Sequence, residues 1–221
     1  MSNKNYLSIY AKSFNWAGFF LPEKTYQKCS SLYDFCRTVD NIADNDEELE
    51  VKKNNLLVFK NDFLNKNYNN IIIKNMWDLM DHHLISIKII KDLFDGVESD
   101  LSKKVQLNNK KDLLIYSYRV AGTVGLMMAK ILNVKGDNSM KAAIDLGIAM
   151  QLTNISRDIV EDSKVNRFYI KNDFETIRDT LALADLFYKS SFIAIKEIPF
   201  KFRFAILVAR RVYKKIGDKI L

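Results

Sequence analysis

Two short segments of the sequence each carry a pair of aspartates four residues apart, a spacing that suits a metal ion. Asp40 and Asp44 lie in YDFCRTVDNIAD, and Asp158 and Asp162 lie in QLTNISRDIVED. On a helix each pair stacks on one face, about 5.4 Å apart along the axis. Two buried carboxylates this close repel each other and need a cation. Mg²⁺ suits such a pair because it takes hard oxygen ligands and keeps water and phosphate oxygens in its shell.

Basic and amide side chains accompany both pairs. Arg37 precedes the first pair and Arg157 precedes the second. A guanidinium group binds phosphate oxygens through two parallel hydrogen bonds. Polar residues of the second segment follow one helical stripe, at spacings of three, four and four: Gln151, Asn154, Asp158 and Asp162. Two such helices facing each other would hold a magnesium–diphosphate cluster between them.

The alternative for either pair is a solvated helix face, where aspartates at this spacing are common. Apolar residues nevertheless flank both pairs: Val39, Ile42 and Ala43 beside the first, and Ile155, Ile159 and Val160 beside the second. Neither segment therefore has the pattern of a simple charged surface.

The composition indicates that long helices position these residues. Of the 221 residues 48% are hydrophobic, which excludes a disordered chain. Only 2 Pro and 7 Gly occur, whereas an all-β fold needs a turn every ~8–12 residues. The formal net charge of +7 suits an anionic partner, such as nucleic acid, an acidic membrane surface or a phosphate-bearing substrate.

Apolar residues recur at intervals of three and four between short polar breaks, which predicts amphipathic helices. The expected helices span Pro22–Asp44, Leu49–Leu64, Lys74–Leu93, Lys111–Leu132, Met140–Glu161, Phe174–Ile198 and Phe200–Ile220. The stretch from Ala142 to Ile155 is apolar on nearly all sides, which is typical of a central helix. We expect a single all-α domain, a helical bundle over residues 1–221.

Cysteine usage and hydropathy bear on location. Cys29 and Cys36 are the only cysteines, too few to staple a domain of this size, which favours a reduced intracellular protein. The N-terminus has no signal-peptide hydrophobic stretch, and nowhere do ~18 uncharged apolar residues run together. We expect a cytoplasmic protein whose two cysteines are small core residues.

From about Lys12 to Asp218 the chain resembles the squalene/phytoene synthase family, the head-to-head prenyltransferases. The resemblance rests on SFNWAGFFLP (13–22), YDFCRTVDNIAD (33–44), DGVESDL (95–101), YSYRVAGTVGLM (116–127), QLTNISRDIVEDSKVNRFYI (151–170) and the tail ARRVYKKIGDKI. The tail, with Tyr213 and Ile216-Gly217, is most like that of bacterial phytoene synthases.

The resemblance implies an isoprenoid-synthase bundle with a central cavity, in which two allylic prenyl diphosphates condense. Mg²⁺ on both aspartate segments would assist departure of the diphosphate. Attack by the second molecule gives a cyclopropyl diphosphate, and a second ionisation rearranges it to the C1–C1′ linked hydrocarbon. The remaining walls must be dry and apolar because water would quench the cations.

The resemblance also assigns roles to single residues. The metal-binding acids match Asp40, Asp44, Asp158 and Asp162, with Asn154 as a further ligand. Diphosphate-binding basic positions match Arg37, Arg157 and Arg167. Substrate-contacting positions match Ser13, Tyr33, Gln151, Tyr169 and Tyr213. Tyr116 matches a tyrosine that stabilises cations or assists proton transfer, although by pattern alone it is a core aromatic, and Tyr118 is expected to be structural.

Some residues keep two interpretations. Gly122 and Gly125 lie inside a predicted helix, where they leave room for a substrate chain or a kink, or allow close helix packing. Asp95-Gly96 and Asp100 match a family element, but by pattern alone they indicate a helix end and a turn. The span from Tyr169 to Tyr213 is shorter than in relatives by about a helix, so we expect a bundle shortened in its C-terminal half.

The favoured prediction is a Mg²⁺-dependent phytoene synthase of carotenoid biosynthesis, which joins two geranylgeranyl diphosphates through prephytoene diphosphate. Mn²⁺ is expected to be able to serve in place of Mg²⁺. NADPH is not expected to be needed for phytoene formation. The alternatives are a squalene or dehydrosqualene synthase acting on farnesyl diphosphate, and a non-catalytic relative acting as an assembly factor. Prenyl diphosphates and a membrane, contacted peripherally, are the expected partners. Nucleic acid is not expected, because basic residues are interleaved with acidic ones.

Overall fold

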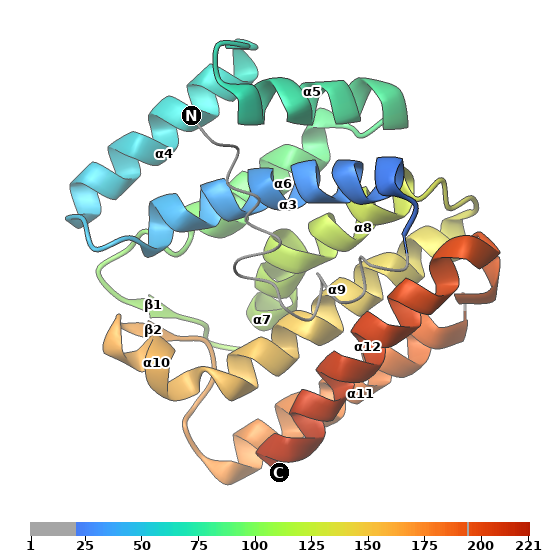
Figure 1. The fold of residues 1–221 in the computed structure, drawn as a ribbon. Helices are drawn as coiled ribbons and strands as arrows, with labels where there is room; N and C mark the ends of the chain where they lie inside the picture. The colour runs from blue at the N-terminus through green and yellow to red at the C-terminus, as the bar shows by residue number, and fades with distance from the viewer. Residues whose placement is uncertain (1–20, 194) are drawn as a thin grey trace.

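The computed structural model describes residues 21–193 and 195–221, apart from the side chains of residues 193 and 196 (Figure 1). The regular secondary structure of this part of the chain is helical, apart from one pair of short strands. The elements are α3 (Glu23–Asp44), α4 (Leu49–Leu64), α5 (Ile71–His83), α6 (Ile87–Glu98), β1 (Val105–Gln106), α7 (Lys110–Ser117), a π-helical turn (Tyr118–Gly122), α8 (Thr123–Ile131), α9 (Asp137–Arg157), α10 (Ile159–Lys164), β2 (Arg167–Phe168), α11 (Phe174–Ile193), a 3₁₀ turn (Ile195–Glu197) and α12 (Phe200–Ile220).

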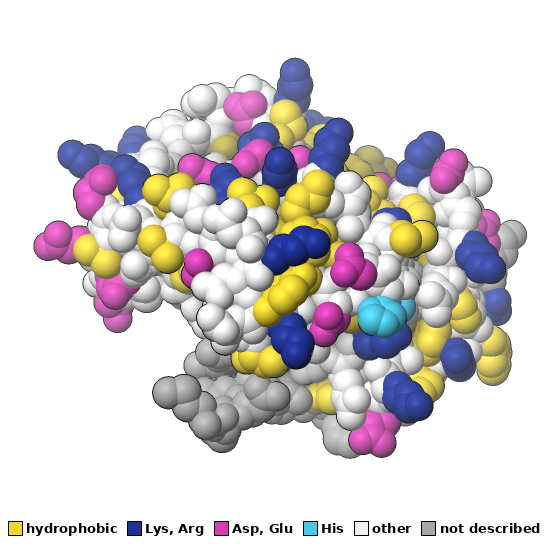
Figure 2. Space-filling view, turned by 90° about the horizontal axis from the view of Figure 1, so that it is seen from above, with side chains coloured by type: hydrophobic (Ala, Val, Ile, Leu, Met, Phe, Trp, Pro, Cys, Tyr) yellow, Lys and Arg dark blue, Asp and Glu magenta, His cyan; other side chains and the backbone are white. Residues whose placement is uncertain are grey.

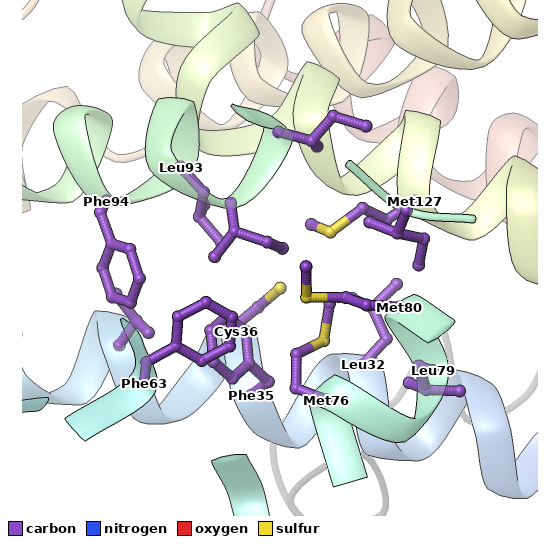
Figure 3. Packing of buried hydrophobic residues seen from close by; sticks show 14 of the residues in the cluster. Leu32, Phe35, Cys36, Phe63, Met76, Leu79, Met80, Leu93, Phe94 and Met127 are labelled. Atoms are coloured by element: carbon purple, nitrogen blue, oxygen red, sulfur yellow. The ribbon is translucent and has the colours of Figure 1, made fainter. Parts of the chain in front are cut away.

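An aromatic core lies between α3 and the helices that cover it. α3 packs against α4, α5, α6 and α8. Phe35, Phe63 and Phe94 are fully buried, and their ring centroids lie 5.3 to 6.1 Å apart (Figure 3). Cys29 and Cys36 are buried in the same core, as predicted. Rings at these separations add edge-to-face attraction to the burial of apolar area, so this region holds α3 firmly.

The second core surrounds α9, which crosses the middle of the molecule in Figure 1. α9 packs against α7, α8, α11, α12 and the π-helical turn. Ala149, Leu152 and Ile155 are almost fully buried. This confirms the prediction of a central helix, because a helix contacted on every side must be apolar all round.

α8 and the turn that precedes it both approach the backbone of α9 closely, each at a glycine. A Cβ at Gly125 would lie 2.2 Å from the Ala143 carbonyl oxygen, and one at Gly147 would lie 2.3 Å from that of Ala121. The preceding turn, Tyr118–Gly122, is π-helical rather than α-helical. The close packing expected for this glycine-containing helix is therefore present, and an irregular turn precedes it.

The predicted helix Lys74–Leu93 is wrong, because the chain breaks between α5 and α6. Leu84 adopts a left-handed conformation with φ 51°, which ends α5. The Ser86 hydroxyl then accepts a hydrogen bond from the backbone N–H of Lys88 at 3.2 Å and caps α6. A serine N-cap is a helix-start signal, but here the surrounding apolar periodicity masked it.

Strands β1 and β2, which the sequence did not predict, join two distant loops. They pair in parallel, with Val105 opposite Arg167 and Gln106 opposite Phe168. The Val105 N–H donates to the Asn166 carbonyl at 2.9 Å. The pairing brings the segment after α6 to the segment after α10.

In the described ranges, none of the helices combines the length and apolarity needed to span a membrane.

Candidate active site

The structure gathers residues of both aspartate segments around one polar pocket. Its lining comes from α3, α6, α7, the π-helical turn, α9, α10 and the loops joined by β1 and β2. The polar side chains of this lining are Arg37, Asp40, Asp44, Asp100, Tyr116, Gln151, Asn154, Asp158, Asp162, Arg167 and Tyr169. We call this the polar pocket. Both aspartate segments therefore face one pocket, as expected of two facing helices, although the second segment does not lie on a single helix.

The first segment lies on an uninterrupted helix and is held from outside. Asp40 and Asp44 are one turn apart on α3. Arg167 donates from Nη1 to Asp44 Oδ1 at 2.8 Å and from Nη2 to the Ala43 carbonyl at 3.3 Å. The Arg167 side chain is only 15% exposed, so this ion pair is partly shielded from solvent. The β1–β2 pairing places Arg167 in this position.

The second segment does not lie on one helix, so the predicted helix Met140–Glu161 is wrong beyond Arg157. Asp158 caps the C-terminus of α9 with φ −99° and ψ 12°, and Asp162 belongs to α10. The backbone N–H of Asp162 still donates to the Asp158 carbonyl at 2.8 Å, which keeps one turn between them. Both aspartates therefore still reach the polar pocket.

Arg157 binds the aspartate beside it in sequence. Its Nε and Nη2 donate to the two carboxylate oxygens of Asp158, each at 2.6 Å. The Arg157 side chain is 43% exposed and does not line the polar pocket. Arg37 and Arg167 do line it. The three arginines assigned to diphosphate by resemblance thus occupy two different environments.

The polar pocket concentrates negative charge. Burial, followed by repulsion from Asp44, raises the pKa of Asp40 to about 7. Burial, followed by repulsion from Asp158, raises the pKa of Asp162 to about 6. Both shifts mean that the charged forms are costly until a cation arrives.

The donor set of the polar pocket fits a hard cation. The Asn154 carboxamide oxygen is buried and has no hydrogen-bond partner among the described residues. In that same part of the chain, no three acidic, histidine or cysteine side chains converge to hold a metal by themselves. A metal ion bound by protein oxygens on opposite walls of the pocket would therefore need further ligands that do not come from the protein. Mg²⁺ meets this condition, because it keeps waters and phosphate oxygens in its shell.

The sequence did not identify Asp100 as a site residue. Asp100 follows α6, and both of its oxygens accept hydrogen bonds at 2.8 Å, from Tyr116 and from Tyr169. Its place in DGVESDL, just past a helix end, was the signal that could have identified it. Tyr118 donates to Asp92 at 3.0 Å and lines neither the polar nor the apolar pocket, in keeping with its expected structural role.

A second, apolar pocket of about 240 Å³ adjoins the polar one. The two pockets share Asp40, Val120, Gln151 and Asn154 in their linings. Residues of α8, α9 and α12 form most of its wall, and Tyr213 lies among them. An amphiphile with an anionic head and an apolar tail matches such a pair of pockets.

Two predicted substrate-contacting residues are not placed in these pockets. Tyr33 lies half-buried on α3 and lines neither of them. Burial raises the pKa of its hydroxyl, and the charges of Arg37 and Tyr213 also act on it. Ser13 lies outside the described residues.

Comparison with known proteins identifies the family. The model of the family described as squalene/phytoene synthase matches residues 7–174. The chain therefore belongs to the squalene/phytoene synthase family.

Relatives in this family carry the name phytoene synthase. The 15-cis-phytoene synthase of Pantoea ananas is 28% identical over 247 aligned residues, which cover 97% of this chain and 80% of the relative. The corresponding enzyme of Paracoccus sp. is 33% identical over 147 residues, or 58% of this chain and 48% of the relative. The chain thus matches about half the length of several curated relatives.

Solved structures confirm the all-α isoprenoid-synthase fold. A dehydrosqualene synthase solved with a ligand superposes with a TM-score of 0.75 at 26% identity, covering 95% of this chain and 81% of the other. The squalene synthase HpnC of Alicyclobacillus acidocaldarius superposes with a TM-score of 0.81 at 18% identity, covering 97% and 89%. At that identity the second likeness bears on the fold alone.

Proposed function

We propose that the chain is a Mg²⁺-dependent phytoene synthase that joins two geranylgeranyl diphosphates through prephytoene diphosphate. One observation carries the proposal: an acidic, arginine-flanked pocket opens into an apolar pocket of the same bundle. The relatives named phytoene synthase support the choice of product.

Each part of the polar pocket has a role in this proposal. Asp40, Asp44, Asn154, Asp158 and Asp162 hold the metal, with Mn²⁺ as an expected substitute. The bound cation supplies Lewis-acid stabilisation of the departing diphosphate. Arg37 and Arg167 bind diphosphate oxygens from the pocket walls. Arg157 fixes the orientation of the Asp158 carboxylate, to which it already donates two hydrogen bonds.

The apolar pocket holds the prenyl chains and excludes water from the cations. Gln151 lies where the two pockets meet, so it contacts the substrate near its reacting carbon. Tyr213, on α12, contacts the prenyl chain of the substrate. Tyr33 and Ser13 are proposed as further substrate contacts. Tyr116 and Tyr169 line the polar pocket, where aromatic faces would stabilise a nearby cation.

The test is an incubation of purified protein with Mg²⁺ and geranylgeranyl or farnesyl diphosphate separately, without NADPH, followed by product analysis. A C40 hydrocarbon with a central conjugated triene supports the proposal. A C30 product, or a cyclopropyl diphosphate that accumulates until NADPH is added, moves the protein to the squalene or dehydrosqualene branch. No product from either substrate, with the protein folded, overturns the proposal in favour of a non-catalytic role.

We also propose a cytoplasmic protein that contacts an anionic membrane peripherally, because the hydrocarbon product is insoluble in water. Phe200 is 84% exposed and Phe204 55%, and Lys201 and Arg203 lie on the same helix start. Exposed aromatics beside basic residues favour binding at a lipid interface. Phe200→Ser with Phe204→Ser is expected to weaken cosedimentation with phosphatidylglycerol vesicles, and unchanged cosedimentation would contradict it.

A nucleic-acid partner is not part of the proposal. On the face seen from above, Lys and Arg side chains lie interspersed with Asp and Glu (Figure 2). Non-specific nucleic-acid binding needs basic residues gathered on one surface.

A further inference from the structure

Three side chains from distant segments meet in a closed hydrogen-bond triangle. Tyr116 Oη lies 2.8 Å from Asp100 Oδ2, and Tyr169 Oη lies 2.8 Å from Asp100 Oδ1. The two phenol oxygens lie 2.9 Å apart. The rings stack at a centroid distance of 4.7 Å, and each tyrosine is only 7% exposed.

The proton content of this triangle can be counted. Three short oxygen–oxygen contacts need three protons, and the two phenols supply only two. When Asp100 is ionised, both phenols donate to the carboxylate and the contact between Tyr116 and Tyr169 lacks a proton. When Asp100 is neutral, all three contacts hold one. The cluster can therefore take up one proton without any atom moving far.

The triangle lies beside two adjoining pockets. Tyr116 and Tyr169 line the polar pocket. Asp100 lines both the polar pocket and an outer pocket bounded by residues 43–49, 100–103 and 161–167. A proton that enters at a tyrosine hydroxyl can therefore leave from Asp100 without returning to the polar pocket.

We propose that Asp100 is a positioning residue and the proton acceptor behind Tyr116 in the last step of the reaction, a proposal that rests on the proposed function. A carbocation that becomes a conjugated triene without a reductant must lose a proton. The C–H bond breaks, and its electron pair forms the new C=C bond. The proton passes to Tyr116 Oη, which releases its own proton to Asp100 Oδ2, and Asp100 becomes neutral.

Charged groups around the triangle set its proton affinity. Burial raises the pKa of Asp100, while Arg167 and the two tyrosine hydrogen bonds oppose that rise, and Asp44 adds to it. Asp40 and Asp162 also feel the charge of Asp100. Since burial is the largest of these causes, proton uptake at Asp100 is favoured over uptake at a fully exposed carboxylate.

The decisive variant is Asp100→Asn, because a carboxamide can accept from one phenol and donate to the other. The triangle keeps its hydrogen bonds but can no longer take up a proton. We expect kcat for C40 hydrocarbon formation to fall by about 10²-fold or more. Consumption of prenyl diphosphate and KM should change little, and cyclopropyl diphosphate, or alcohols formed by water capture, should accumulate.

Asp92→Asn is the matched control, since Asp92 accepts a hydrogen bond from Tyr118 at 3.0 Å and lies outside both pockets. It should make hydrocarbon like the unmodified chain. Unchanged hydrocarbon formation by Asp100→Asn, or equal losses in both variants, would overturn the proposal. If the unmodified chain and Asp92→Asn both make no product, the proposed function itself fails, and the relay fails with it.

Tyr169→Phe gives a second measurement that does not depend on the folding of Asp100→Asn. Tyr169 donates a hydrogen bond that favours ionised Asp100. Its removal should raise the pKa of Asp100, so the acidic limb of the kcat–pH profile should move to higher pH. A limb that stays in place, with lowered kcat at every pH, would contradict the relay.

Discussion

The two aspartate segments share a spacing but differ in how the fold holds them. Asp40 and Asp44 lie on an unbroken helix, and a partly buried ion pair from β2 fixes the second of them. Asp158 and Asp162 straddle the junction of α9 and α10, and a more exposed arginine next in sequence fixes the first of them.

One wall of the polar pocket is therefore held by tertiary contacts, and the other is held by contacts local in sequence. The first segment is anchored by Arg167, whose position depends on pairing between distant loops. The second is anchored by its own neighbour Arg157 and by one backbone hydrogen bond across the helix junction. Substitution of the two anchoring arginines should therefore cause losses of activity of different size. Substitution of a metal-binding aspartate in either segment should cause losses of similar size.

The largest effect is expected where the two segments are equal. Asp40→Asn and Asp158→Asn should each lower turnover by more than about 10²-fold. Substituting a residue that only hydrogen-bonds to a metal ligand already lowers metal affinity or activity by about 10–100-fold. Steady-state product formation at saturating Mg²⁺ measures this. Asp81→Asn, on the exposed end of α5, is the control.

Stability provides the counter-check for these two variants. The carboxylate of Asp40 is costly to ionise, so Asp40→Asn should leave the metal-free melting temperature at pH 8 unchanged or higher. A large drop in melting temperature would mean that the lost turnover reflects misfolding, and near-normal turnover in either variant would remove these residues from the metal site.

The next effect distinguishes the segments. Arg167→Ala should lower kcat/KM by about 10²-fold, because it removes the anchor of Asp44 together with a donor that we propose binds the diphosphate. Arg167→Lys should recover only part of this, since an ammonium cannot reach Asp44 and the Ala43 carbonyl as a planar fork does. Full recovery by lysine would show that charge alone matters.

A smaller effect is expected at the second anchor. Arg157→Ala should lower kcat/KM by about tenfold, because Arg157 acts through Asp158 and does not line the polar pocket. The affinity for Mg²⁺, followed by activity against metal concentration, should weaken in parallel. A loss as large as that of Arg167→Ala would mean that Arg157 contacts the diphosphate directly.

The smallest effect is on stability and pH. The pKa values of Asp40 and Asp162 rise from 3.8 to about 7 and about 6. As pH rises through this window the unfolded chain releases these protons first, so the metal-free protein should lose stability between about pH 4 and pH 7.

Melting curves with EDTA and with Mg²⁺ at pH 5 and pH 8 measure this dependence. Mg²⁺ should raise the melting temperature by several degrees at pH 8 and by less at pH 5, because it binds ionised carboxylates. An equal gain at both pH values would place the bound metal away from Asp40 and Asp162.

Much of the fold followed from local pattern. The periodicity of Ala142 to Ile155 predicted the central helix α9, and the first aspartate segment lies on α3 as its spacing required. These elements are long, and each buries a face that its own residues define. The single-domain extent over residues 1–221 and the roles of the individual site residues stay predictions.

What the sequence did not predict depends on contacts between distant residues. By sequence pattern Ser86 is one polar position within a predicted helix. In the structure the left-handed conformation of Leu84 ends α5, and Ser86 becomes the N-cap of α6. Asp100 gains its importance only because two tyrosines, 16 and 69 residues away, turn toward it. The β1–β2 pairing that orients Arg167 involves two residues on each strand, too few to leave a periodic signal.

The near-contact of Gly125 with Ala143, and of Gly147 with Ala121, has a consequence for how such proteins diversify. All four residues line the apolar pocket, so this part of its wall carries no side chain larger than a methyl group. No substitution can enlarge that side, and any added methyl group would force two helices apart. Divergence toward longer or shorter products must therefore act elsewhere in the lining, through larger side chains such as Met128, Leu132 and Ile206.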